Sequence, residues 1–218
     1  MTNPGMNIST RMDQRSVEDW SAIRESIGQW QSLMPERIKA LLLQLQEQAA
    51  GSGFSQLQHS LQTATRALRA GASEELIVAA LCHDIGTAIS VENHSAIAAE
   101  ILKPYVSSEV YEVVRAHQDF QRSHYDPTMG RDTKARRKYS SEKWFKLACR
   151  FSDEWDQTSF DPTYDTLTIE RFEPMIGRVF RGTLNNGNPR ENIRRRLWKS
   201  AKHWIRRRIF PRGLPTTQ

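Results

Sequence analysis

The segment FSQLQHSLQTATRALRAGASEELIVAALCHDIG, which spans residues 54–86, decides the fold. Its first part predicts a helix over residues 54–70 that stops at Gly71, a residue type that commonly ends helices. Ser73 is a favourable N-cap for a second helix, which has acidic residues in its first turn and ends near Gly86. This second helix is strongly apolar, so we expect it to lie at the centre of a helical bundle.

Helical periodicity also marks the N-terminal part of the chain. Apolar residues recur at the i, i+3 and i+4 spacing of an amphipathic helix at Trp20, Ile23, Ile27 and Trp30. Pro35 suits the first turn of a further helix, which residues 51–53, a Gly-Ser-Gly stretch, bring to an end.

Three more helices are expected after the opening segment, over about residues 93–102, 107–118 and 141–155. The polar segment of residues 121–138 contains Pro127 and Gly130 and predicts a loop. No segment alternates convincingly between apolar and polar residues with a period of two. We therefore predict an all-α fold.

The charge is unevenly distributed along the chain. The net charge is +6, but residues 181–218 carry +10 and residues 1–180 carry −4. A mildly acidic body argues against a nucleic-acid-binding core and for a separate basic appendage. No apolar run approaches the roughly 20 residues that a membrane span needs, and the polar N-terminus lacks a signal-peptide core. We expect a cytoplasmic protein.

Four of the six histidines fall one each on four successive predicted helices, at His59, His83, His94 and His117. Asp84 directly follows His83 inside an apolar helix, where a carboxylate is costly unless it is paired or metal-bound. Imidazole and carboxylate groups suit first-row metals, and a carboxylate has two oxygens with which to bridge a metal pair. Helical bundles build such sites from ligands on facing helices. The alternative is that each histidine is a separate surface or core residue.

These residues resemble the HD superfamily. His59 is followed after 24 residues by the His83-Asp84 step, and the additional His94 and His117 resemble the subset with two metals. Residues 154–162 contain the runs Glu-Trp-Asp-Gln and Phe-Asp-Pro, and residues 172–174 read Phe-Glu-Pro. With these runs the chain resembles the small HD-domain diiron oxygenases related to the hydroxyphosphonate-cleaving dioxygenases and, more distantly, the myo-inositol oxygenases. The resemblance covers about residues 55–180.

The resemblance implies a role for each of six ligands. One metal would be held by His59, His83, Asp84 and Asp156, and the other by His94, His117 and the second oxygen of Asp84. Catalysis would depend on Asp84. Asp153, three residues before Asp156 and on the same face of an α-helix, is the alternative last ligand. The cofactor would be two Fe ions, although the ligand types also accept Mn or Zn.

The resemblance further implies an oxygenase that uses O2 to cleave a hydroxylated small molecule, polyhydroxylated or anionic, such as a phosphonate. Thr87 stands where relatives often place Lys or His, which puts an identical substrate in doubt. Thr87 and Gln121 are the candidate substrate-binding residues. Arg115, Gln118, Arg122 and His124 are further candidates for an anionic head group. The alternatives are a metal-dependent phosphohydrolase acting on a phosphate ester and a regulatory HD module without catalysis.

We predict three regions. Residues 1–50 would form an N-terminal helical extension, residues 51–184 the HD domain, and residues 185–218 a linker with a basic amphipathic C-terminal helix. The tail's tryptophans and arginines would pack against the domain or a partner subunit, or make peripheral contact with an anionic membrane. Nucleic acid is the least favoured partner because no nucleic-acid-binding motif is present.

Overall fold

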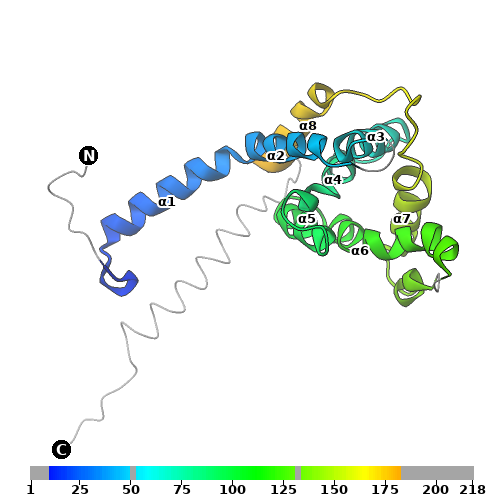
Figure 1. Cartoon of the computed structure of the whole chain (residues 1–218). Helices are drawn as coiled ribbons and strands as arrows, with labels where there is room; N and C mark the ends of the chain where they lie inside the picture. The colour runs from blue at the N-terminus through cyan, green and yellow to red at the C-terminus, as the bar shows by residue number, and fades with distance from the viewer. Residues whose placement is uncertain (1–9, 50–52, 131–133, 183–218) are drawn as a thin grey trace, which may run out of the picture.

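A computed structural model describes residues 10–49, 53–130 and 134–182 (Figure 1). These residues form an all-α fold, as predicted, and the only β pairing among them is an isolated bridge between Ala49 and Ser55. The α-helices are α1 (Val17–Ser32), α2 (Met34–Gln44), α3 (Gln56–Arg69), α4 (Glu74–Cys82), α5 (His94–Leu102), α6 (Ser108–Tyr125), α7 (Phe145–Arg150) and α8 (Ile169–Arg181).

The apolar helix α4 lies at the centre of the bundle, as expected. All of its residues from 76 to 82 are buried, and it packs against α3, α6 and α8. A capping box starts α3, because the Ser55 side chain accepts from the Gln58 backbone amide and the Gln58 side chain accepts from that of Ser55. Helix α5 packs on α6, and α2 packs on α8. This arrangement holds α3, α4, α5 and α6 around one buried region.

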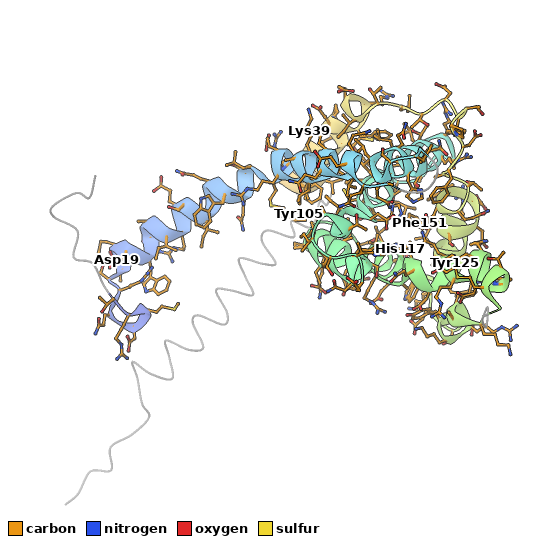
Figure 2. All side chains as sticks on the ribbon, in the orientation of Figure 1. Asp19, Lys39, Tyr105, His117, Tyr125 and Phe151 are labelled. Carbon is orange, nitrogen blue, oxygen red and sulfur yellow. The ribbon has the colours of Figure 1, made fainter. Side chains whose placement is uncertain are left out.

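Helix α1 forms as predicted, but its apolar stripe is not buried. It begins with a capping box between Ser16 and Asp19 and extends away from the bundle (Figures 1 and 2). None of its residues is buried, and Ile27 and Trp30 are 42% and 58% exposed. Helical periodicity therefore predicted the conformation of this segment correctly but not its packing.

Helix α2 contributes to the core although it lies in the predicted N-terminal extension. Ile38 and Leu42 on α2, and Leu45 directly after it, are at most 1% exposed and pack within the main apolar cluster. The predicted domain boundary at residue 50 stays a prediction. The predicted linker and basic helix of residues 185–218 lie outside the described residues, and so does the membrane contact expected of them.

The prediction of a loop over residues 121–138 is wrong for the part of this segment that the structure describes. Helix α6 continues to Tyr125 and is followed by 3-10 helices over Asp126–Met129 and Ala135–Tyr139. The helix persists because no glycine or proline lies between Ser108 and Pro127, and because Arg122 pairs with the buried Asp126 carboxylate at 2.8 Å. Tyr139 then returns to α6, where its ring stacks on Phe120.

The end of α4 also differs from the sequence prediction. The α-helix stops at Cys82, and the chain continues into a 3-10 helix, η3 (Ile85–Ala88), which packs on α5. A Cβ atom on Gly86 would lie 2.2 Å from the His94 backbone oxygen, so only glycine allows this approach. Gly86 thus places the start of α5 directly beside the His83-Asp84 step.

Within the described residues, no helix combines the length and the apolar character needed to cross a membrane.

Candidate metal centre

The four predicted histidines come together in the bundle, each from a different helix. His59 lies on α3, His83 directly follows α4 as its C-cap, His94 begins α5 and His117 lies on α6, where Figure 2 labels it. All four are buried, with at most 8% of their surface exposed. A fifth buried residue, Asp84, lies among them and is 4% exposed.

Each of these histidines uses its Nδ1 atom in a hydrogen bond to a backbone carbonyl. The acceptors for His83, His94 and His117 are the carbonyls three residues earlier, at 2.8, 2.6 and 2.7 Å, and the acceptor for His59 is the Ser159 carbonyl at 3.0 Å. Because a carbonyl can only accept, each Nδ1 must carry the proton. In its neutral form each imidazole would therefore turn an unprotonated Nε2 atom toward the centre, as metal-binding histidines do.

One group of donor atoms gathers around the first candidate metal position. His59 Nε2 and His83 Nε2 are 3.2 Å apart, and Asp156 Oδ1 lies 3.1 Å from the former and 3.5 Å from the latter. Asp84 Oδ2 completes the group, at 3.3 Å from His83 Nε2 and 3.6 Å from His59 Nε2. We refer to these four residues as the first group.

A second group uses the other oxygen of the same aspartate. Asp84 Oδ1 lies 3.1 Å from His94 Nε2 and 3.2 Å from His117 Nε2, and the two Nε2 atoms are 3.3 Å apart. Asp84 therefore directs one oxygen to each pair of histidines. This is the arrangement that a carboxylate bridging two metal ions requires.

The donor set fits metal ions for an electrostatic reason. Asp156 is fully buried, and neither of its oxygens accepts a hydrogen bond from any residue that the structure describes. Buried Nε2 lone pairs also face one another within each group. Such an arrangement is costly unless cations compensate it. The donors of His59, His83 and Asp156, and those of His83, Asp84 and His117, lie close enough together to hold an ion.

The ionisation of the metal-free centre reflects the same crowding. Burial would lower the pKa of His83, but the Asp84 and Asp156 carboxylates raise it well above its usual value. Burial would likewise lower the pKa of His94, but the Asp84 carboxylate raises it above its usual value. Burial would raise the pKa of both carboxyls, yet the neighbouring histidines hold the pKa of Asp84 and that of Asp156 below the usual value. Without metal, protons take the place of the cations.

These shifts predict opposite pH trends with and without metal. Raised histidine pKa values stabilise the fold below pH 6.5, the unfolded value, and that contribution is lost as the pH rises through the folded pKa values. The lowered pKa of Asp84 stabilises the fold above pH 3.8, the unfolded value, and this contribution is lost only at lower pH. Urea unfolding of the metal-free chain should therefore give a free energy that falls from pH 6.5 to 8.5. With saturating Mn²⁺ it should rise over the same range, because metal binding needs unprotonated histidines.

If the metal-free chain instead became more stable from pH 6.5 to 8.5, the prediction that its buried histidines are protonated would be wrong.

The structure brings Asp156, rather than Asp153, to the histidines. Helix α7 widens into a π-helix, η6 (Phe151–Asp156), and this wider turn separates two residues that an α-helix would place on one face. The Asp153 carboxylate, 39% exposed, instead pairs with His124 at 3.0 Å and Arg136 at 2.7 Å. Single π-helical turns are common at functional sites.

Sequence reasoning missed two residues beside the ligands. The Gln56 side-chain amide donates to Asp84 Oδ2, and the Phe160 ring stacks on the His59 imidazole with ring centroids 4.4 Å apart. Gln56 lies one helical turn before His59, which is the one sequence signal that could have indicated it. Phe160 belongs to the Phe-Asp-Pro run of the resemblance, but nothing in the sequence indicates its ring contact.

The two candidate substrate-binding residues are only partly buried. The Thr87 hydroxyl donates to the Asp84 backbone oxygen at 2.8 Å, so it is turned to its own chain. Gln121 lies on α6 one turn after His117. Among the further candidates, Arg115 pairs with Glu112 and Arg122 with Asp126. These ion pairs engage both arginines with acidic residues of the same stretch of chain.

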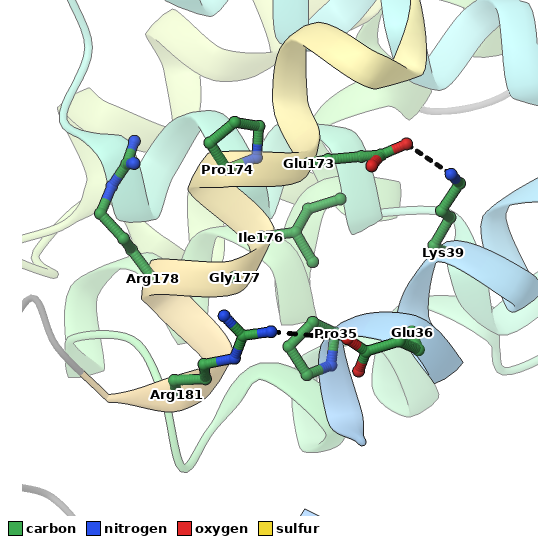
Figure 3. A pocket seen from close by; sticks show the side chains of 9 residues that line it. All are labelled: Pro35, Glu36, Lys39, Glu173, Pro174, Ile176, Gly177, Arg178 and Arg181. Atoms are coloured by element: carbon green, nitrogen blue, oxygen red, sulfur yellow. Dashed lines mark hydrogen bonds and ion pairs between the residues drawn. The ribbon is translucent and has the colours of Figure 1, made fainter. Parts of the chain in front are cut away.

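A surface cavity of about 400 Å³ lies elsewhere, between α2 and α8 (Figure 3). Glu173 and Pro174, from the run that contributed to the resemblance, line this cavity, and Glu173 pairs with Lys39. None of the six clustered residues lines it. The metal centre and this cavity are therefore separate features.

The fold and the cluster together define a helical domain with a buried His/Asp site able to hold metal. Comparison with known families supports this class, because the model of the HD domain matches residues 57–160, which include all six clustered residues. The match supports placement in the HD superfamily, whose members are typically metal-dependent enzymes that bind divalent metals. No curated protein matches the chain.

Proposed function

We propose that this protein is an HD-domain diiron oxygenase that cleaves a hydroxylated small molecule with O2. The observation that carries the proposal is the position of Asp84, which directs one oxygen to His59 and His83 and the other to His94 and His117. A single metal would need only the first group, so a second pair of buried histidines around the same carboxylate favours a two-metal centre.

The chain's own residues would prepare the centre for this chemistry. The backbone carbonyls that accept from each Nδ1 fix the imidazole tautomers and hold the rings in place. Burial of the ligands limits the access of water, and only Asp84 and His94 among them have more than 1% of their surface exposed. When bound, an iron pair would supply the one-electron chemistry that O2 requires.

The substrate would approach from the side of Asp84 and His94, and it would be polyhydroxylated or anionic. Thr87 and Gln121 remain the proposed substrate-binding residues, because both are partly buried. Thr87 is close in sequence to Asp84, and Gln121 is close to His117 of the second group. A threonine in place of a cationic residue fits a neutral hydroxyl group better than it fits a phosphonate.

The test is metal content per chain after anaerobic purification, with low-temperature EPR before and after mild reduction. We expect about two irons per chain and a mixed-valent signal, followed by O2 uptake with a hydroxylated phosphonate or a polyol. The matched control is His94→Ala, which should keep iron at the first group and lose the mixed-valent signal.

Either one metal per chain, or Mn or Zn without a redox signal, would contradict the oxygenase. A screen of phosphate esters would then test the metal-dependent phosphohydrolase.

A further inference from the structure

Among the residues that the structure describes, Gln56 is the one polar side chain outside the six clustered residues that donates a hydrogen bond to the Asp84 carboxylate. It is the first residue of α3, directly after the N-cap Ser55, and its Nε2 donates to Asp84 Oδ2. We propose that Gln56 is a positioning residue that fixes the carboxylate plane of Asp84 and so strengthens metal binding at the first group. This inference rests on the two-metal centre of the proposed function.

The contact is asymmetric between the two groups. Asp84 Oδ2, which Gln56 contacts, faces His83 and His59, whereas Asp84 Oδ1 faces His94 and His117. Gln56 therefore acts directly on the oxygen that belongs to the first group. Loss of the amide would remove a hydrogen bond from Oδ2 alone, while Oδ1 would keep its own two neighbours.

An amide is chemically suited to this role. A carboxylate oxygen has two lone pairs, so Oδ2 can bind a metal with one and accept from Gln56 with the other. The amide is neutral and cannot compete with the metal by adding a charge. Hydrogen-bond partners of metal-binding carboxylates commonly contribute about 10- to 100-fold to metal affinity.

The position of Gln56 also indicates the open edge of the centre. Gln56 is only partly buried, and Phe160, which stacks on His59, is 47% exposed. By contrast, His59, His83 and Asp156 are at most 1% exposed. The amide thus fixes Asp84 from the solvent side of the bridge, and its removal leaves the buried side of the first group intact.

Titration of the metal-stripped full-length chain with Co²⁺, followed by visible absorption, tests the proposal. In Gln56→Ala we expect one of two binding steps to weaken about tenfold and the other to change less than about twofold. The control is Gln58→Ala, which removes a capping hydrogen bond in the same helical turn without touching Asp84. It should leave both steps unchanged, which separates positioning from a loss of helix stability.

A second background assigns the weakened step. In His94→Ala the first group remains complete, so adding Gln56→Ala should still weaken the remaining Co²⁺ step about tenfold. Equal weakening of both steps, no weakening of either, or no Gln56 effect in the His94→Ala chain would each overturn the proposal. If the His94→Ala chain does not fold, the comparison of the two steps in the otherwise unchanged chain decides.

The outcome is independent of the oxygenase reaction, since Co²⁺ binding needs neither O2 nor substrate. A single Co²⁺ step in the unchanged chain would contradict the two-metal function. The role of Gln56 would then be tested by whether Gln56→Ala weakens that single step.

Discussion

Replacing Asp84 by alanine is expected to remove both metal ions from the chain. Its two oxygens lie within 3.6 Å of four histidine Nε2 atoms, and no other described residue contacts both histidine pairs through separate oxygens. The first group would keep three donors and the second only two, His94 and His117. The second group would also lose its only negative charge, and the first group would keep that of Asp156 alone. Metal analysis after dialysis should fall from about two ions per chain to near zero.

Asp153→Ala is the matched control for this change. Asp153 is an aspartate three residues from a proposed ligand, but its carboxylate pairs with His124 and Arg136 outside the cluster. That variant should keep its metal content. If Asp84→Ala retained two ions per chain, the bridging assignment would be wrong, and if Asp153→Ala lost metal, the choice of Asp156 would be in error.

Replacing Gly86 by alanine should destabilise the fold and disturb the second group. An added Cβ would meet the His94 backbone, with its oxygen at 2.2 Å, its Cα at 2.7 Å and its carbonyl carbon at 2.8 Å. Backbone atoms cannot rotate away as a flexible side chain can, so η3 and the start of α5 must separate. Overpacking of this kind costs about 1–3 kcal/mol, and we expect a value at the upper end because the neighbour is backbone. Urea unfolding of the metal-free variant measures this loss.

The displacement of α5 has a functional consequence, since His94 is the first residue of that helix. Metal affinity at the second group should fall along with stability. The control is Gly28→Ala on α1, where an added Cβ meets no atom within 4 Å. It should be neutral or raise helix stability by about 0.5–1 kcal/mol. A Gly86→Ala chain as stable as the unchanged protein would mean that η3 and α5 are not packed this closely.

Several features of the candidate site were accessible only from the folded chain. The acceptors of three histidine Nδ1 atoms are the backbone carbonyls of Ala80, Val91 and Val114. Every residue type carries such a carbonyl, so no sequence signal can mark these positions. The contact between Gln56 and Asp84 joins residues 28 positions apart and depends on how α3 lies against α4. The exposure of the α1 stripe likewise depends on what packs on it.

The sequence by itself determined the all-α class and the four histidines with Asp84, because apolar periodicity and a carboxylate inside an apolar helix are local signals. It left Asp153 and Asp156 as alternatives, since an α-helix places both on one face. Only the tertiary structure decided which of them meets the histidines. The π-helical turn at Phe151–Asp156 buries Phe151, Ser152, Trp155 and Asp156 and leaves Asp153 to its surface partners, because a wider turn changes which side chains share a face.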